Sequence, residues 1–411
     1  MASHASVAIS DTQVRQAESA LTVARSDFRP QLLGNWEYTF SDARGGRRFT
    51  TLGGIPVGVG GSQERHQSTL AGSYTVFDSG LRKARLREAR ATLDRADSSR
   101  DLALVDLTYQ VAADYSTLLL EQRAAELARE RVSQAQAHLA LVEATIQAGL
   151  AAEVDRFPLQ AELAQAQLSL VTAANRARQA SIVLRNTIGL SAGEALAGEE
   201  PPAIPDIAGL PSVEDALAAA HDWRPDLREA EAGVSAAVAS LEQSRVTARP
   251  LLSVGATYLW KVEPAPSGRD FVLDAQLSFP IFDAGARRAQ TVGAKQGLDS
   301  AQLRLSQLQK DAAAQVAQAR LAVTTAWERI NAAEVSVNAA RRSLESAEGR
   351  YAAGQAITIE ITDAQVTYYN AQLDAASARY DYLTALAALR RSVGLPTRGF
   401  ENLTEARLLE Q

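Results

Sequence analysis

The chain has 411 residues, a formal net charge of −6 and no cysteine. The negative charge argues against a nucleic-acid partner, and the lack of cysteine excludes disulfides, thiolate catalysis and cysteine-held zinc. Four histidines lie far apart without metal-ligand spacing, so we predict no metal site, no cofactor and no catalytic constellation. Ala, Leu, Gln, Glu and Arg dominate the composition, which favours long helices.

A helical pattern starts the chain and predicts a helix over about 10–28. Arg29-Pro30 ends it, because proline disfavours the helical conformation in the residue before it. No charged-then-apolar leader precedes this helix, and no run of 18 apolar residues occurs anywhere. We therefore expect no transmembrane helix, and a mature or shortened form if the protein is exported.

Alternation of apolar and polar residues follows this helix and predicts strands over about 31–41 and 67–77. The glycine-rich segment 42–66 between them is expected to form a long mobile loop outside the cell. Each strand has about 10 residues, the length that crosses a bilayer at a tilt. A soluble amphipathic hairpin is the commoner setting for such alternation and stays open as the alternative.

The segment 81–147 contains neither proline nor glycine and predicts a single helix of about 100 Å. Its apolar residues recur at spacings of three and four, as in Val105, Tyr109 and Ala112, which indicates coiled-coil-like packing. A turn at Gly149 and a return helix over about 153–188 follow. Many remaining positions are alanine and bury little area, so we expect lateral partners.

The second half of the chain repeats this pattern. Phe77-Asp78-Ser79-Gly80 recurs as Phe282-Asp283-Ala284-Gly285, and Gly189-Leu190 recurs as Gly394-Leu395, each 205 positions downstream. The pattern predicts two structural repeats, residues 1–205 and 206–411. The second repeat is expected to hold strands over about 251–260 and 271–281, a long helix over 286–353 and a return helix over 357–393; segments 190–226 and 395–411 are expected to be equatorial.

Four strands per chain are too few to close a membrane barrel, and an open sheet edge is not viable in lipid. If the strands lie in a membrane, the chain must therefore oligomerise, and three copies would supply 12 strands. Polar strand faces would line a lumen and apolar faces would meet lipid. Five aromatic residues are candidates for membrane-interface girdles, or else for the core of a soluble sheet: Trp36, Tyr38, Tyr74, Tyr258 and Trp260.

The segment from Tyr351 to Gln365, Tyr-Ala-Ala-Gly-Gln-Ala-Ile-Thr-Ile-Glu-Ile-Thr-Asp-Ala-Gln, resembles the second coiled-coil tip and return helix of the outer-membrane efflux (TolC-like) family. The twofold Phe-Asp-Xaa-Gly and the run Arg224-Pro225-Asp226-Leu227 are also similar to family features. The resemblance covers about residues 10–395. It departs from the family in a shortened N-terminal part, in the absence of an N-terminal cysteine, and in Ala356 where members often carry a basic residue.

The resemblance implies a mixed, mainly α fold, in which a coiled-coil helical barrel continues into a membrane β-barrel. It implies a homotrimeric export duct in the outer membrane of a Gram-negative-type cell, with its helical part in the periplasm. The partners implied are a periplasmic adaptor protein, an inner-membrane pump and outer-membrane lipid. A soluble coiled-coil scaffold or a periplasmic adaptor protein is the alternative function.

Candidate functional residues gather at the predicted helical tips. Asp155, Glu360 and Asp363 correspond to the acidic side chains that ring the closed periplasmic gate in the family; helix N-terminal acids that complement the helix dipole are the alternative. Tyr351 is a candidate latch through its hydroxyl, or a packing residue. The turns are candidates for adaptor docking because small residues allow close approach: Gly149, Leu150, Ala151, Gly354, Gln355 and Ala356.

Overall fold

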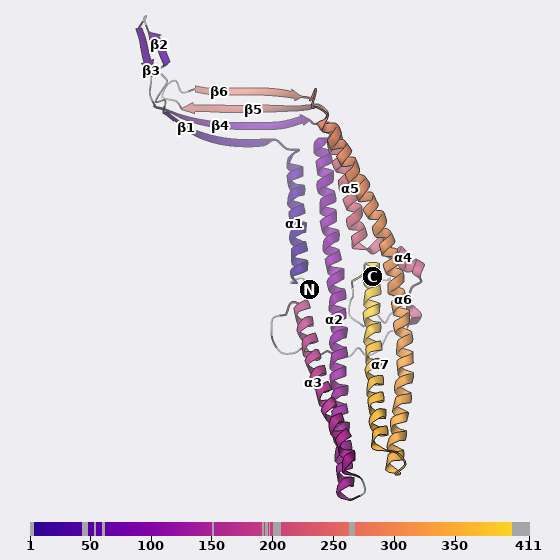
Figure 1. Ribbon diagram of the computed structural model, residues 1–411. Helices are drawn as coiled ribbons and strands as arrows, with labels where there is room; N and C mark the ends of the chain where they lie inside the picture. The colour runs from indigo at the N-terminus through magenta and orange to yellow at the C-terminus, as the bar shows by residue number, and fades with distance from the viewer. Residues whose placement is uncertain are drawn as a thin grey trace. The chain divides into compact units, whose positions relative to one another are not determined.

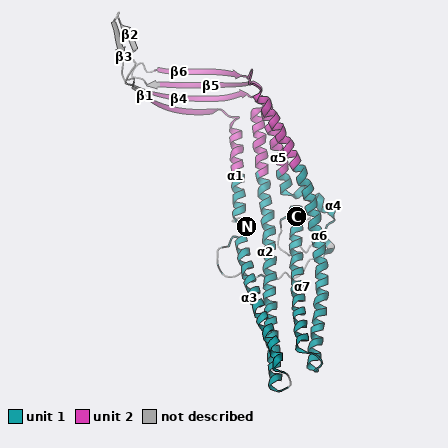
Figure 2. Ribbon diagram, viewed as in Figure 1, with its two compact units in different colours: residues 1–14, 96–229, 305–411 teal, residues 15–95, 230–304 magenta. Residues whose placement is uncertain are grey.

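A computed structural model describes residues 4–42, 48–52, 55–59, 62–149, 152–190, 193, 196, 198–199, 207–262 and 268–396. The fold is mixed and mainly α, with long helices and a four-stranded antiparallel sheet (Figure 1). The chain divides into two compact units, coloured in Figure 2. Unit 1 comprises Met1–Val14, Ala96–Glu229 and Leu305–Gln411; unit 2 comprises Arg15–Arg95 and Ala230–Arg304. Within the described residues, no helix is long and apolar enough to span a membrane.

The sheet of unit 2 has the strand order β1-β4-β5-β6, and every neighbouring pair is antiparallel. Two strands come from each half of the chain, and β1 and β6 lie at the open edges. The strand bounds are Gln31–Asp42 for β1, Ser62–Phe77 for β4, Leu251–Val262 for β5 and Gly268–Ser278 for β6.

The expectation of a continuous loop over 42–66 is wrong. Strands β2 (Arg48–Leu52) and β3 (Ile55–Val59) pair as a small antiparallel hairpin within it, and β4 begins at Ser62. The segment carries Ile55, Val57 and Val59 at alternate positions, a β pattern that the glycine pairs around it obscured.

The register of the four-stranded sheet sorts its side chains onto two chemically different faces. Directly paired residues share a face, and one row runs Trp36–Ser68–Trp260–Arg269 while another runs Gly34–Leu70–Tyr258–Phe271. The rows of the other face are mostly polar, as in Asn35–Thr69 and Gly255–Asp274. Apolar and polar side chains therefore alternate along the strands, so that one face of the sheet is apolar and the other is polar.

In each half of the chain a helix precedes the sheet strands and the longest helix follows them. The long helices are α2 (Leu81–Gln147) and α6 (Ala286–Ala352), and each contributes residues to both units (Figure 2). Buried positions of α2 recur every seven residues, as in Val105, Ala112 and Leu119, the period of coiled-coil packing. The other helices are α1 (Ala5–Ser26), η1 (Glu153–Asp155), α3 (Arg156–Thr187), η2 (Ile207–Gly209), α4 (Val213–Trp223), α5 (Pro225–Val246) and α7 (Thr358–Val393).

The twice-occurring Phe-Asp-Xaa-Gly motif caps both long helices in the same geometry. Oδ1 of Asp78 accepts the Gly80 N–H at 3.1 Å and Oδ2 accepts the Arg82 N–H at 2.7 Å. Asp283 does the same for Gly285 at 3.1 Å and Arg287 at 3.0 Å. The aspartate thus satisfies backbone donors that the start of a helix leaves free.

The side-chain environment of the two caps differs. Asp78 pairs with Arg82 at 2.9 Å, with side chains only 10% and 14% exposed, whereas the Asp283–Arg287 pair spans 3.6 Å and is about twice as exposed. Burial favours a higher pKa for Asp78, but the Arg82 and Gly80 N–H groups and the Arg82 charge together leave its pKa lowered. The Arg287 N–H is the main cause of the lowered pKa of Asp283.

We expect Asp78→Ala to destabilise unit 2 by about 1–2 kcal/mol, because it removes a helix cap and leaves Arg82 without its carboxylate partner. Asp283→Ala is the matched variant and should cost less. Because the pKa of Asp78 is lowered in the folded state, its contribution is present above the ordinary carboxyl pKa and is lost as the pH falls through the lowered value. Denaturant unfolding of the two variants at neutral and acid pH measures both effects; equal losses at neutral pH would contradict the assignment.

In unit 1, α3 packs on α2 and α7 packs on α6 (Figure 1). Leu118 of α2 meets Ala180 and Leu184 of α3. Val323 and Ile330 of α6 meet a cluster on α7 that includes Tyr382 and Leu386. We call the α2–α3 pair the first hairpin and the α6–α7 pair the second hairpin.

Several contacts among the described residues join the two hairpins, and we call four of them, which lie along α2, the seam. They involve, from the α7 C-terminal end toward the tips, Asp106 with Arg391, Leu119 with Tyr380 and Leu383, Arg131 with Tyr369, and His138 with Tyr351.

Candidate functional site

Both helical tips turn at a glycine with a positive φ, +75° at Gly149 and +70° at Gly354. The Gly149 N–H donates to the Ile146 carbonyl and the Gly354 N–H donates to the Tyr351 carbonyl, each at 2.9 Å. A Cβ added at either glycine would meet no atom within 4 Å. Within this chain, glycine is therefore required by the turn itself and not by a close neighbour.

Exposed apolar side chains surround these turns. Val154 and Phe157 follow the first turn, and Ile357 and Ile359 follow the second; each is more than half exposed. Gln355 is exposed and Ala356 is half-buried, while the predicted docking residues Leu150 and Ala151 lie outside the described residues. Apolar groups gathered at two exposed tips are typical of a surface that meets another protein.

The predicted gate acids lie near the tips in three different settings. Asp155 is half-buried at the N-cap of α3 and makes no side-chain capping bond. Glu360, in the first turn of α7, forms an ion pair with Arg350 of α6, whose Nη2 lies 2.7 Å from the carboxylate. Asp363 is exposed and lies one turn further along α7. No hydrogen bond or ion pair of the described residues joins Asp155 to Glu360 or Asp363.

Tyr351 lies at the end of α6 and contacts a residue that sequence reasoning missed. Its ring stands edge-on to the imidazole of His138 of α2, with centroids 5.9 Å apart and planes at 89°. His138 is buried and the ring of Tyr351 packs against Leu344, Ala347 and Ile361. The contact places the ring of Tyr351 in the seam.

A second polar cluster lies on α2 one heptad before His138. Arg131 donates from Nε at 3.1 Å and from Nη2 at 2.7 Å to Oε1 of Glu162 on α3. Its guanidinium carbon lies 5.0 Å from the ring centroid of Tyr369 on α7. Burial raises the pKa of the Tyr369 phenol, and the Arg131 charge partly opposes that rise. One arginine therefore joins three helices of both hairpins.

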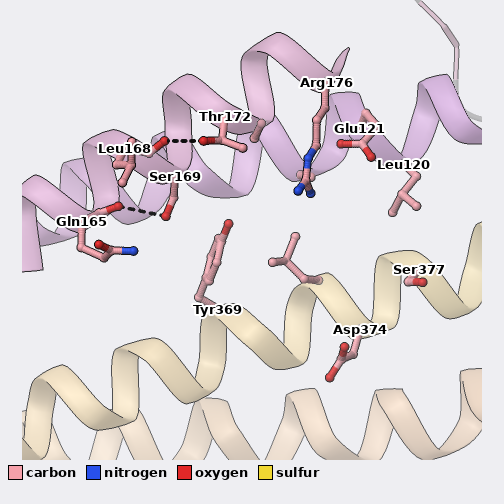
Figure 3. Close-up of a pocket in the computed structure, with 13 residues that line it drawn as sticks. Leu120, Glu121, Gln165, Leu168, Ser169, Thr172, Arg176, Tyr369, Asp374 and Ser377 are labelled. Carbon is pink, nitrogen blue, oxygen red and sulfur yellow. Dashed lines mark hydrogen bonds between the residues drawn. The ribbon is translucent and has the colours of Figure 1, made fainter. Parts of the chain in front are cut away.

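Next to this cluster, a groove of about 460 Å³ runs among α2, α3 and α7 (Figure 3). Tyr369 points from α7 toward α3 within it, and Leu120 and Leu168 supply apolar walls. Its charged groups are Glu121, Arg176 and Asp374, the last of which lies on α7. The groove is therefore lined by residues of both hairpins.

The sequence contained a signal for these missed residues. Ala128, Ala135 and Val142 of α2 are buried and recur every seven residues. Arg131 and His138 are also seven residues apart and interleave with them at helical spacing. A charged or titratable side chain in an otherwise apolar stripe indicates a buried polar contact.

Comparisons with known proteins agree on one family. The model of the outer membrane efflux protein family matches residues 2–190 and 216–395. The pyoverdine export outer membrane protein OpmQ of Pseudomonas putida is 26% identical over 408 residues, covering 94% of this chain and 82% of OpmQ. Protein CyaE of Bordetella pertussis is 27% identical over 336 residues, covering 78% of this chain and 69% of CyaE.

Among solved structures, that of CusC superposes with a TM-score of 0.81 at 18% identity and covers 95% of this chain and 89% of CusC. This likeness shows the fold, and the family match decides between the two function classes considered from the sequence. Members of the family are outer-membrane channels of efflux and secretion systems, not enzymes and not soluble scaffolds. This chain belongs to the outer membrane efflux protein family.

Proposed function

We propose that three copies of this chain form an exit duct, recruited by a periplasmic adaptor protein and an inner-membrane pump. The observation that carries the proposal is the open, two-faced sheet. Edges β1 and β6 are unpaired in the described chain, and lipid cannot satisfy such edges. Pairing β6 of one copy with β1 of the next would close a barrel of three four-stranded sheets, with the polar face toward the lumen.

Apolar faces of two helices support the same assembly in unit 1. Leu321 and Val335 of α6 are 66% and 70% exposed and lie 14 residues apart, two heptads along one helix face. Leu168 and Ile182 of α3 have the same spacing and are 59% and 65% exposed. Stripes of this kind are typical of unpartnered coiled-coil faces, and we assign the α6 stripe to the α3 stripe of the next copy.

The duplicated sequence fits this proposal. We infer that residues 1–205 and 206–411 are two copies of one structural unit; the predicted equatorial segments 190–226 and 395–411 lie partly outside the described residues. Support comes from the repeated cap at Asp78 and Asp283, whose backbone hydrogen bonds have equivalent partners in both halves. Two similar units per chain would give three copies a nearly sixfold wall.

We assign the remaining predicted sites within this duct. Trp36, Tyr38, Tyr74, Tyr258 and Trp260 fall on the apolar face of the sheet by register, where amphipathic rings suit the membrane interface. The tips around Gly149 and Gly354 are the adaptor-docking surface, and their exposed apolar side chains support it. Asp155, Glu360 and Asp363, with Tyr351 beside them, form the periplasmic gate.

Two measurements test the duct. The mass of the purified protein in detergent should correspond to three copies of the 43.9-kDa chain, and the protein should form discrete channels in planar bilayers. A stable monomer that forms no channels would contradict the proposal.

The gate makes a further prediction for these channels. Glu360→Gln with Asp363→Asn should weaken cation selectivity and block by divalent ions, because fewer carboxylates would crowd the constriction. Asp363→Asn alone should give most of the effect, since Arg350 already pairs with Glu360. Asp374→Asn, on the same helix about 16 Å further along, is the matched control. Unchanged selectivity in the double variant would place the constriction elsewhere.

A further inference from the structure

His138 is a buried titratable residue at the tip end of the seam with an unsatisfied ring nitrogen. Its side chain is 7% exposed and lies between the buried Ala135 and Val142 on the same face of α2. Its Nε2 atom is buried without a hydrogen-bond partner. The Tyr351 ring of the second hairpin stands against the imidazole. The neutral ring therefore acts as a packing group that holds the first hairpin to the second.

The charged side chains around this contact either form ion pairs with one another or make no hydrogen bond to His138. Arg131 pairs with Glu162, and Arg350 pairs with Glu360. The antiparallel pairing of Arg131 with Glu162 places His138 level with Asp155, yet no carboxylate bonds to Nε2. Charged groups on the surrounding helical segments include Glu130, Arg131 and Glu143 of α2, Glu153, Asp155, Arg156 and Glu162 of η1 and α3, Glu345, Glu348 and Arg350 of α6, and Glu360 and Asp363 of α7.

We propose that the seam is an acid-sensitive switch in which protonation of His138 separates the α6–α7 hairpin from α2 near the tips. A charged imidazole at this position would be buried against an aromatic edge with no acceptor at Nε2, an arrangement that disfavours the closed seam. In an opened seam the same ring meets water. The switch would add regulation to the gate, and only its effect on export rests on the proposed function.

The direction of the pH dependence follows from linkage. Burial lowers the pKa of His138 from its ordinary value of 6.5, and no neighbouring charge contributes to that change. An exposed imidazole in the open form titrates near the ordinary value, so between the two pKa values the open form binds more protons. The closed seam is fully stable above pH 6.5 and loses stability as the pH falls, by up to about tenfold in the closed-to-open ratio per pH unit and per chain.

The absence of cysteine in the natural chain permits a direct test. Ala140→Cys on α2 and Ser346→Cys on α6, both exposed positions of unit 1, would carry spin labels on the two sides of the seam. The full-length labelled protein in detergent, diluted with unlabelled chains, is measured by double electron–electron resonance from pH 8 to pH 5. We expect a population with a longer distance between the two spin labels, and this population should grow below about pH 6.5. A distribution of label distances that does not change with pH overturns the proposal.

Substitutions identify the group responsible. His138→Phe keeps an aromatic ring against Tyr351 but cannot take a proton, so the acid-dependent population should disappear. His221→Phe, at an exposed histidine of α4 in the same unit, should leave it unchanged. A response that survives in His138→Phe overturns the proposal. Loss of the response in Glu360→Gln with Asp363→Asn, while His138→Leu retains it, would assign the response to the gate carboxylates instead.

A measurement without substitution keeps the test independent of folding defects. Solid-state NMR of the wild-type protein labelled with ¹⁵N-histidine should show the His138 ring still neutral at a pH just below 6.5, the ordinary pKa of an imidazole. A His138 ring that takes up its proton at or above pH 6.5 would overturn the proposal. The planar-bilayer measurement tests the proposed duct and not the switch. A protein that forms no channels but opens its seam in acid would contradict the duct and support the switch.

Discussion

Leu321→Glu with Val335→Glu, on the exposed face of α6, should convert the proposed trimer into monomers. Both side chains face water in the single chain, so the substitutions should change the stability of the protomer by no more than about 0.5 kcal/mol. In the proposed trimer they would be buried against the next copy. Unpaired buried carboxylates cost several kcal/mol, and each loss of about 1.4 kcal/mol weakens association tenfold.

The α3 stripe offers a rescue that tests the pairing itself. Adding Leu168→Lys and Ile182→Lys to the double variant should restore the trimer, because lysines at the same two-heptad spacing would face the glutamates across every interface. Leu321→Ala with Val335→Ala is the control that removes apolar area without adding charge, and it should stay largely trimeric. Native mass spectrometry measures the assembly and circular dichroism checks the helices.

Two outcomes would contradict the assigned interface. A trimer that persists with both glutamates would show that the α6 stripe does not face another copy. Monomers that persist in the fourfold variant would show that the stripe meets an element other than α3. The mass and the helicity of each variant therefore separate a wrong interface from a misfolded chain.

The second large effect is expected at Gly394, compared with its counterpart Gly189. Both glycines end a return helix with a positive φ, +89° and +75°. In both copies the following leucine N–H donates to an arginine carbonyl at 2.9 Å, Leu395 to Arg390 and Leu190 to Arg185. An alanine at either position would occupy a left-handed conformation at a cost of roughly 1–2 kcal/mol.

Only Gly394 has a close neighbour. A Cβ there would lie 2.6 Å from Cα and 2.8 Å from the backbone nitrogen of Arg224, whereas a Cβ at Gly189 would meet nothing within 4 Å. Arg224 cannot move easily, because its buried guanidinium bonds to Asp226 at 2.6 Å and to the Ser392 carbonyl at 3.0 Å. Overpacking adds roughly 1–3 kcal/mol, so Gly394→Ala should cost roughly 2–5 kcal/mol in total.

Denaturant unfolding of the two alanine variants in detergent measures this difference. Gly189→Ala is the control for the conformational term, since it shares the turn and lacks the contact. Equal losses in both variants would show that the α4–α5 junction gives way around Gly394, and that Arg224 does not fix it.

The local elements of this protein follow from the sequence. Residues 81–147 hold no proline or glycine, and they form one helix whose bounds are those of the uninterrupted run. The alternation that predicted strands places Trp36 and Trp260 in one row of the sheet and Asn35 with Thr69 in the next. These patterns are local consequences of helical and strand periodicity, so they are readable without knowledge of the partners.

Which side chains meet across the helices was decided only by the tertiary structure. Gly189 and Gly394 carry the same sequence signal, but packing places the Arg224 backbone against one of them alone. His138 and Tyr351 are 213 positions apart, and Arg350 lies beside Glu360 only because the tip reverses the chain. Periodicity fixes the buried face of each helix, whereas the partner of that face depends on the relative register and rotation of two helices, which no local pattern encodes.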